Sequence, residues 1–177
     1  MFLFKLNNYT FLNNQSKLRG GGAGIFIHNN INYTILDDQN LNIQNCEELW
    51  IMLKISQNKK LLVSSIYRHP SHNINDFQEL LCKKIEVLNK QKVPFVIGGD
   101  ININVLSDSK YVIDFKNNLI SQGATQLIKS PTRLNCNTST LIDHFYTNIT
   151  EDKTETHTLI FDISDHLPIL TILNPFK

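Results

Sequence analysis

The chain has 177 residues, 41% of them hydrophobic, and a formal net charge of +1 at pH 7. This length predicts a single domain, 1–177, with enough apolar residues for a core, and the near-neutral charge provides no global basic field for nucleic acid. Three widely spaced cysteines argue against a disulfide framework and a structural zinc site, and no apolar run reaches the ~20 residues that span a bilayer.

Apolar runs of strand length begin early in the chain. They predict strands at 25–28, 49–55, 61–67 and 93–97, with a hairpin-like turn at 57–60. The glycine-rich stretch 19–24 is interpreted as a tight turn, because glycine adopts positive φ at low steric cost. The alternative, a phosphate-binding loop, is disfavoured because the stretch has no lysine–hydroxyl pair and no helix after it.

Two segments have the apolar spacing of amphipathic helices. One covers about 76–89, with Asn75 or Ser71 as its N-cap, and the other covers 110–121 and stops at Gly123. Short strands are predicted around Leu127 and at 141–146, 157–161 and 167–173. Because the strands are apolar on both faces, the pattern favours an α/β (α+β) architecture of two packed sheets flanked by helices.

Polar residues follow several of these apolar runs. Tyr67 ends one strand, the pair Asp100 and Asn102 follows another, and two Asp-His dipeptides occur at 143–144 and 165–166. Loops at strand ends are where catalytic side chains collect. Together these groups have the chemistry to hydrolyse a phosphodiester with a divalent metal.

Each group also has a purely structural interpretation. If the chain after Asp100 is extended, Asp100 and Asn102 point to the same side and can orient water or hydrated magnesium. Alternatively, Asp100 bonds its own backbone in a turn. The sequence Asp165-His166 predicts either a phosphate-binding histidine oriented by Asp143 or a cap beside a half-buried histidine.

Other polar positions are equally open. Tyr67 is interpreted either as a site residue or as core packing, and Thr132 either as a cleft residue or as part of a turn. The lysine pairs 59–60 and 83–84 are interpreted as solvated surface rather than as nucleic-acid patches, because paired lysines are ordinary surface residues.

The order and spacing of the motifs resemble those of a known family. The motifs are Ile66-Tyr67-Arg68-His69-Pro70, Gly99-Asp100-Ile101-Asn102, Pro131-Thr132-Arg133, Thr140-Leu141-Ile142-Asp143-His144-Phe145 and Ile163-Ser164-Asp165-His166-Leu167-Pro168, with the stretches 19–25 and 47–50 upstream. The sequence resembles the endonuclease/exonuclease/phosphatase superfamily, with the deoxyribonuclease-I-like fold. More narrowly, it resembles the endonuclease domain of non-long-terminal-repeat retrotransposons, over nearly the whole chain.

The resemblance implies a four-layer αββα sandwich of two mixed β-sheets and a set of site roles. Asp100 would orient or deprotonate the attacking water with help from Asn102. His166, oriented by Asp143, would bond the phosphate, and Tyr67 would bond the phosphate or assist the leaving group. The remaining implied roles are cleft lining for Thr132 and Ser164 and the metal side of the site for Asp165. The implied cofactor is Mg²⁺ or Mn²⁺, and the implied partner is the DNA phosphodiester backbone.

The sequence also departs from the family pattern. That pattern begins with a strand ending in asparagine, a helix, and a strand ending in the principal metal-binding glutamate, and we find no counterpart here. Glu47 and Glu48 occupy a position that is not catalytic in the pattern. We therefore expect a domain incomplete at its N-terminus, weak metal binding and weak or absent nuclease activity.

Three functional hypotheses follow. The first is a metal-dependent, DNA-nicking endonuclease of retrotransposon type. In such elements a reverse transcriptase domain would lie downstream, and the sequence contains nothing of it. The second is a catalytically dead remnant or binding module of the same fold, and the third is a phosphatase of the same superfamily.

Overall fold

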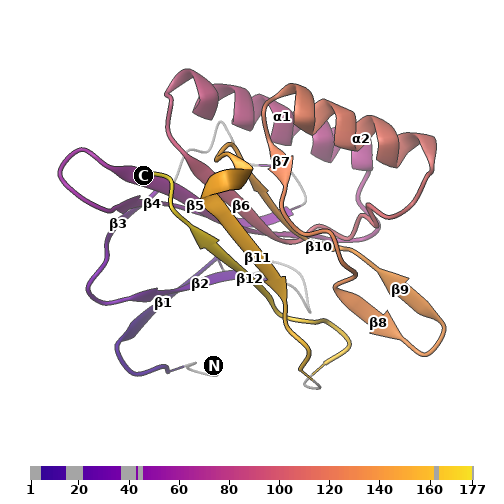
Figure 1. Ribbon diagram of the computed structural model, residues 1–177, viewed down its shortest axis with the longest axis horizontal. Coiled ribbons are helices and arrows are strands. Elements are labelled where there is room, and N and C mark those ends of the chain that lie inside the picture. Colours follow the sequence, from indigo (N-terminus) through magenta and orange to yellow (C-terminus); the bar gives the residue numbers. More distant parts are fainter. Residues whose placement is uncertain (1–4, 15–21, 37–42, 44–45, 162–163, 177) are drawn as a thin grey trace.

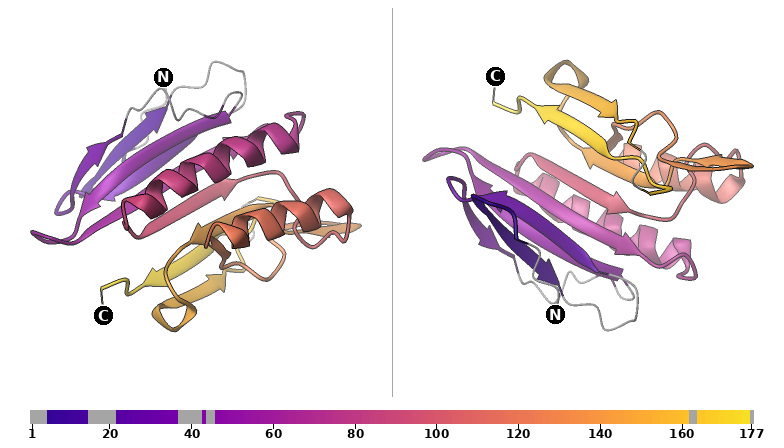
Figure 2. Two further views of the ribbon diagram at one scale, coloured as in Figure 1. Left: turned by 90° about the horizontal axis from the view of Figure 1, so that it is seen from above. Right: turned by 90° about the horizontal axis from the view of Figure 1, so that it is seen from below.

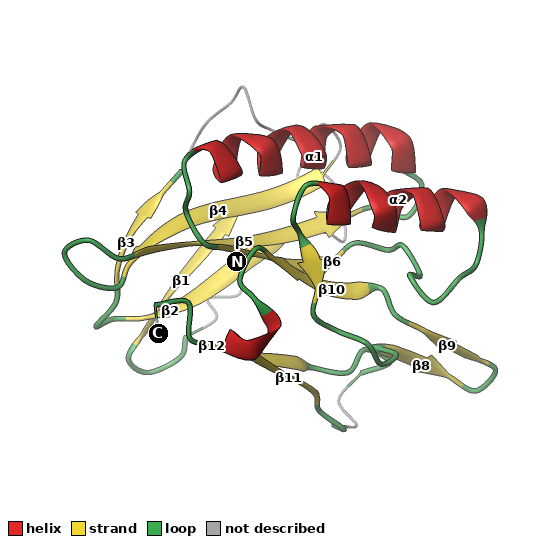
Figure 3. Ribbon diagram, turned by 45° about the horizontal axis from the view of Figure 1, so that its top comes forward, coloured by secondary structure: helices red, strands yellow, loops and turns green. Residues whose placement is uncertain are grey.

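The protein is described by a computed structural model that covers residues 5–14, 22–36, 43, 46–161 and 164–176. Two helices lie on one face of a central sheet, and two β-hairpins lie on its other face (Figures 1 and 3). The predicted α+β sandwich of mixed sheets flanked by helices is confirmed. Both helices of the described residues lie on the same side, so these residues form three layers. Neither helix is long and apolar enough to cross a membrane.

The central sheet has six strands in the order β3-β4-β5-β6-β10-β7. Strands β5 and β6 are parallel and every other neighbouring pair is antiparallel, which makes the sheet mixed. A parallel pair requires a crossover connection, and helix α1 supplies it. The strands are β3 (Asn32–Ile35), β4 (Cys46–Lys54), β5 (Lys60–Arg68), β6 (Phe95–Asp100), β10 (Asp143–Thr147) and β7 (Thr125–Gln126).

Helices α1 (Ile74–Lys90) and α2 (Lys110–Ser121) confirm the two predicted helices. Their apolar sides bury Phe77 and Phe115, among others, against the sheet. The N-cap of α1 is Asn73 rather than Asn75 or Ser71. The Asn73 Oδ1 accepts hydrogen bonds from the backbone N–H groups of Asn75 at 2.8 Å and Asp76 at 3.4 Å. These bonds satisfy donors that the first turn of a helix leaves unpaired.

The second layer consists of the hairpins β1 (Tyr9–Asn14)–β2 (Ala23–His28) and β11 (Thr154–Thr158)–β12 (Ile169–Leu173). Figure 2 shows these two hairpins apart from each other on their face of the central sheet. A third hairpin, β8 (Arg133–Asn135)–β9 (Thr138–Thr140), projects from the body of the molecule (Figure 1), and a 3-10 turn η2 (Glu151–Lys153) precedes β11.

Several element boundaries differ from those expected. Strands β1, β3, β8 and β9 were not predicted, because their sequences are short or polar. Strand β11 begins three residues before the predicted segment 157–161, since its polar side chains alternate in burial without forming an apolar run. Part of the predicted turn, 19–21, lies outside the described residues, while Gly24 lies within β2.

The core divides between the two faces of the central sheet. On β4, Trp50 and Met52 face the helices, while Leu49 and Ile51 face the β1–β2 hairpin. This alternation is the period of two that a strand imposes on its side chains. Each fully buried Leu or Ile contributes about 1.5–3 kcal/mol, so both interfaces stabilise the frame that carries the polar residues described below.

One of the two predicted surface lysine pairs is partly buried. Lys84 lies on the inner face of α1, where its Nζ is 3.0 Å from Glu48 Oε2 and 4.0 Å from the centre of the Trp50 ring. The surface interpretation of Lys84 was therefore wrong. Its spacing of seven residues from Phe77 and three from Leu81 already places it on the apolar stripe of the helix.

Candidate active site

Three of the predicted site residues lie side by side on neighbouring strands. Asp143 on β10 pairs with Asp100 at the end of β6, and Asp100 pairs with Tyr67 on β5. Residues in register on adjacent strands share a face and stand about 5 Å apart. The row lies on the face that carries the hairpins, because Phe95 and Ile97, on the same strand as Asp100, face the helices.

His166 reaches this row from the segment between β11 and β12. Its Nδ1 lies 3.0 Å from Asp143 Oδ2 and 3.1 Å from Oδ1, so the imidazole and the carboxylate form an ion pair when the ring is protonated. The Ser164 Oγ accepts a hydrogen bond from the His166 backbone N–H at 3.1 Å. One ligand atom each from Asp100, Asp143 and His166 lies within 4.8 Å of the others.

The segment after Asp100 is a turn, and the expected extended alternation of Asp100 and Asn102 is wrong. Asn102 has a left-handed backbone, with φ of 54°, and its N–H donates to Asp100 Oδ1 at 3.1 Å. This is the side-chain-to-backbone bond that aspartate forms two residues on. The Asn102 Nδ2 donates to Arg68 O at 2.9 Å, so part of the amide is committed to the backbone.

The surroundings of Asp100 favour its neutral form. Burial, followed by the negative charge of Asp143, raises the pKa of the Asp100 carboxyl, while the His166 ring and the hydrogen bonds from Asn102 partly offset this rise. Two carboxylates held close together repel each other unless a cation is bound between them. A divalent cation at this position would therefore relieve an existing electrostatic strain.

The donor set matches a hard divalent ion. Mg²⁺ is held by one or two protein carboxylates with water completing its shell, and Mn²⁺ accepts the same oxygen ligands. Asp100 and Asp143 supply the carboxylates, whereas the Nδ1 of His166 is already bonded to Asp143. The residues present therefore fit Mg²⁺ or Mn²⁺ with few protein ligands.

Thr132 does not line a cleft, which corrects its predicted substrate-binding role. Its side chain is completely buried, and its Oγ1 accepts the backbone N–H groups of Ile142 at 3.2 Å and Asp143 at 3.0 Å. Its carbonyl accepts from Leu167 N at 2.6 Å. Thr132 thus fixes the start of β10 and the segment that carries His166, instead of meeting a ligand.

Asp165 lies beside the cluster without joining it. Its Oδ2 accepts a hydrogen bond from Arg133 Nε at 2.7 Å, and this bond holds the pKa of the Asp165 carboxyl below its usual range. Arg133 and His166 also form an isolated β-bridge, which ties the β8–β9 hairpin to the histidine segment. Asp165 is not among the described residues whose ligand atoms group within 4.8 Å, so its role at the metal stays a prediction.

A groove of about 480 Å³ contains the cluster. It runs across the central sheet between β2 and the start of β12, and its floor includes Val63, Gly98 and Phe145. Asp100, Asp143 and His166 line it, so the polar cluster opens onto a largely apolar channel. This channel gives an extended ligand a path past the carboxylates.

Sequence reasoning missed two buried residues next to the site. His144 lies on the helix-facing side of β10, where its Nε2 is 3.2 Å from Leu141 O and its Nδ1 is 3.1 Å from the Tyr146 hydroxyl. Burial lowers the pKa of His144 to about 4. The other is Arg68, one of the largest fully buried side chains among the described residues. Strand alternation from Leu62 through Ile66 already predicts that Arg68 points inward.

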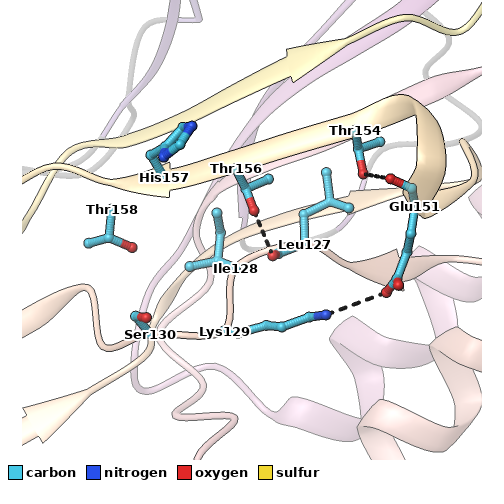
Figure 4. A pocket seen from close by; sticks show the side chains of 9 residues that line it. All are labelled: Leu127, Ile128, Lys129, Ser130, Glu151, Thr154, Thr156, His157 and Thr158. Atoms are coloured by element: carbon cyan, nitrogen blue, oxygen red, sulfur yellow. Dashed lines mark hydrogen bonds and ion pairs between the residues drawn. The ribbon is translucent and has the colours of Figure 1, made fainter.

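A second pocket lies elsewhere and contains none of the predicted site residues. It has a volume of about 340 Å³ and lies between β11 and the segment 127–130 (Figure 4). Lys129 reaches towards Glu151 at 3.5 Å, and Thr156 Oγ1 donates to Leu127 O at 3.2 Å. These polar groups are engaged with one another, and the pocket is separate from the carboxylate cluster.

Comparison with solved structures identifies the fold. The endonuclease domain of TRAS1, a telomere-specific non-LTR retrotransposon, is 17% identical with a TM-score of 0.72, and the match covers 97% of this chain and 81% of that one. The Neisseria 3′ phosphatase NExo is 13% identical with a TM-score of 0.65, and the match covers 93% of this chain and 79% of that one. An AP endonuclease from Archaeoglobus fulgidus is also 13% identical, with a TM-score of 0.64, and the match covers 94% of this chain and 80% of that one. Neither family models nor curated proteins match the sequence. The predicted resemblance to the endonuclease/exonuclease/phosphatase proteins is thus confirmed at the level of the fold.

Proposed function

We propose that this protein hydrolyses phosphodiester bonds of DNA in a metal-dependent reaction at the Asp100, Asp143 and His166 cluster. The observation that carries the proposal is the convergence of two carboxylates and an imidazole within 4.8 Å at one groove. These residues come from two strands and a distant loop, and together they supply the positioned base, phosphate-binding group and cation ligands that hydrolysis of a phosphodiester uses.

Asp100 and Asp143 would hold a hydrated Mg²⁺ or Mn²⁺. When bound, the cation would stabilise the charge that develops on the leaving oxygen. Since the group found among the described residues contains two carboxylates, we expect weak metal binding and slow turnover. Asp165, whose Oδ2 pairs with Arg133, is proposed as a further ligand on the metal side.

Asp100 is proposed to orient the attacking water and to take its proton. A carboxylate has about four acceptor sites, so one bond from the Asn102 amide leaves others for water. Asn102 is proposed to hold this turn and to help place the water.

His166 is proposed to donate a hydrogen bond from Nε2 to a non-bridging phosphate oxygen. With Nδ1–H donating to Asp143, the Nε2 can donate to the phosphate only in the imidazolium form. Ser164 is proposed to keep the backbone of His166 in place at the cleft. Tyr67, adjacent to Asp100 in the sheet, is proposed to contact the phosphate or the leaving group.

The test is nicking of supercoiled plasmid by the purified chain with Mg²⁺ or Mn²⁺. We expect slow nicking that stops with EDTA and falls at least ~100-fold in Asp100→Asn and His166→Ala, because each removes a positioned catalytic group. The matched controls are Asp114→Asn on α2 and His157→Ala on β11, and both residues are exposed. These two variants should nick plasmid at the normal rate. Equal nicking by Asp100→Asn and Asp114→Asn would contradict the proposal.

A second substrate, DNA with 3′-phosphorylated ends, separates the alternatives. Release of phosphate from 3′-phosphorylated ends without nicking would assign a phosphatase. A chain that neither nicks nor releases phosphate with either metal, yet folds cooperatively, would support a binding module or catalytically dead remnant.

A further inference from the structure

Arg68 is a buried cation directly behind the proposed active site. It ends β5, its side chain is 1% exposed, and its guanidinium lies 5.9 Å from the centre of the Phe77 ring. None of the salt bridges between described residues involves it. Burial of a charge is unfavourable unless the group is fully hydrogen-bonded, so the bonds of this side chain must account for its presence.

All three nitrogens of the guanidinium donate to backbone carbonyls. The Nε donates to Ile101 O at 2.6 Å, the Nη2 to Asn102 O at 2.8 Å, and the Nη1 to His72 O. The three carbonyls belong to two loops, the turn after β6 and the segment before α1. The donors of arginine are spread over three nitrogens in one plane, whereas the three donors of lysine diverge from a single nitrogen, so lysine does not reproduce this pattern.

The turn that Arg68 holds is strained and functional. Asn102 has φ of 54°, a conformation that non-glycine residues keep only when the surroundings impose it. The two side chains bond each other's backbone: Asn102 Nδ2 donates to Arg68 O, and Arg68 Nη2 donates to Asn102 O. The Asn102 N–H in turn donates to Asp100 Oδ1. A continuous series of bonds therefore joins the guanidinium to the Asp100 carboxylate.

We propose that Arg68 is a positioning residue that locks the Asp100–Asn102 turn and so sets the orientation of the Asp100 carboxylate towards water and metal. The proposal rests on the proposed function for its catalytic meaning. Arg68 itself touches neither substrate nor metal, and it acts through the backbone at 101–102.

The first measurement uses the unmodified chain. In a ¹H–¹⁵N spectrum, the Arg68 Nε–H should exchange with solvent at least ~10-fold more slowly than the Nε–H of Arg133, because Arg68 is buried and Arg133 is 40% exposed. Equal exchange of the two would overturn the proposal without any variant having to fold.

The second measurement uses Arg68→Lys and Arg68→Met. We expect amide exchange at Ile101 and Asn102 to rise at least ~10-fold while that of Ile97 in the sheet stays within about twofold, because local opening is distinct from global unfolding. The matched control removes the other buried cation, in the double variant Glu48→Gln/Lys84→Met, and should leave the 101–102 amides protected. Unchanged protection at 101–102 in Arg68→Lys would overturn the proposal.

The functional readouts are Mn²⁺ affinity and the division between kcat and KM. Arg68→Lys should weaken Mn²⁺ binding about fivefold and lower kcat for plasmid nicking about tenfold, with KM changed less than about twofold, since only the positioning of Asp100 is lost. A normal kcat and Mn²⁺ affinity in Arg68→Lys would refute the role. If the unmodified chain shows neither Mn²⁺ binding nor nicking, the proposed function fails, while the exchange measurements still decide whether Arg68 locks the turn.

Discussion

Replacing Thr132 by valine tests whether this buried hydroxyl holds the active-site strand. The Thr132 Oγ1 is the acceptor for two backbone N–H groups at the start of β10, those of Ile142 and Asp143. Valine has almost the same shape, so Thr132→Val removes the acceptor without opening a cavity. Both N–H groups then lose their partner, that of Ile142 in a buried environment and that of Asp143 in a partly buried one.

The structure sets the size of the effect. An unsatisfied buried donor costs about 1–3 kcal/mol. Because Asp143 is only partly buried and water can reach its amide, we expect a loss of about 2–4 kcal/mol for the two donors together. Thr132→Ser keeps the oxygen and loses one methyl group, which should cost only about 1 kcal/mol.

The free energy of unfolding in urea measures this difference. If the slope m is the same for all three proteins, the shift in midpoint reports stability alone. The loss should also displace Asp143, and with it the His166 ring, so nicking should fall in Thr132→Val and persist in Thr132→Ser. A valine variant as stable as the serine variant would show that the hydroxyl does not hold β10.

Three further results are expected from the same fold. The pKa of His144 is about 4 in the folded state and 6.5 in the unfolded state, so a contribution to stability of at most about 3 kcal/mol is present above pH 6.5 and is lost as the pH falls towards 4. His144→Gln should flatten the pH dependence of the free energy of unfolding in urea over that interval. An unchanged slope in this variant would contradict the assignment. Removing one partner of the buried Glu48–Lys84 pair by Lys84→Met should cost about 3–5 kcal/mol of stability, and the double variant Glu48→Gln/Lys84→Met should recover part of this loss. Thermal unfolding measures both losses, and losses that simply add for the two substitutions would be inconsistent with a coupled pair. Gly99 has φ of 140°, and an added Cβ would lie 1.9 Å from Ile66 O. Gly99→Ala should therefore cost at least about 2 kcal/mol of stability, measured by circular dichroism melting. A melting temperature equal to that of the parent would argue against this close approach.

Much of the frame was determined by local sequence. The apolar stripe with Phe77, Leu81 and Ile85 predicted α1, because a helix places residues three and four apart on one face. The runs that became β4 and β5 were recognisable from continuous apolar character. Polar strands such as β11 were misplaced, since their burial depends on what packs against them and not on their own composition.

The site divides in the same way. The polar motifs beside the predicted strands, taken with the family resemblance that they carry, predicted that Asp100, Asp143 and His166 share one cleft with Tyr67, Asn102 and Asp165. The structure brings ligand atoms of the first three within 4.8 Å of one another. Only the tertiary structure decided that Thr132 is buried under Asp143, that Asp165 is held by Arg133, and that Arg68 lies behind the turn at 101–102. These roles depend on hydrogen bonds between residues far apart in the chain, and the register of β10 against β6 is what brings those residues within bonding distance.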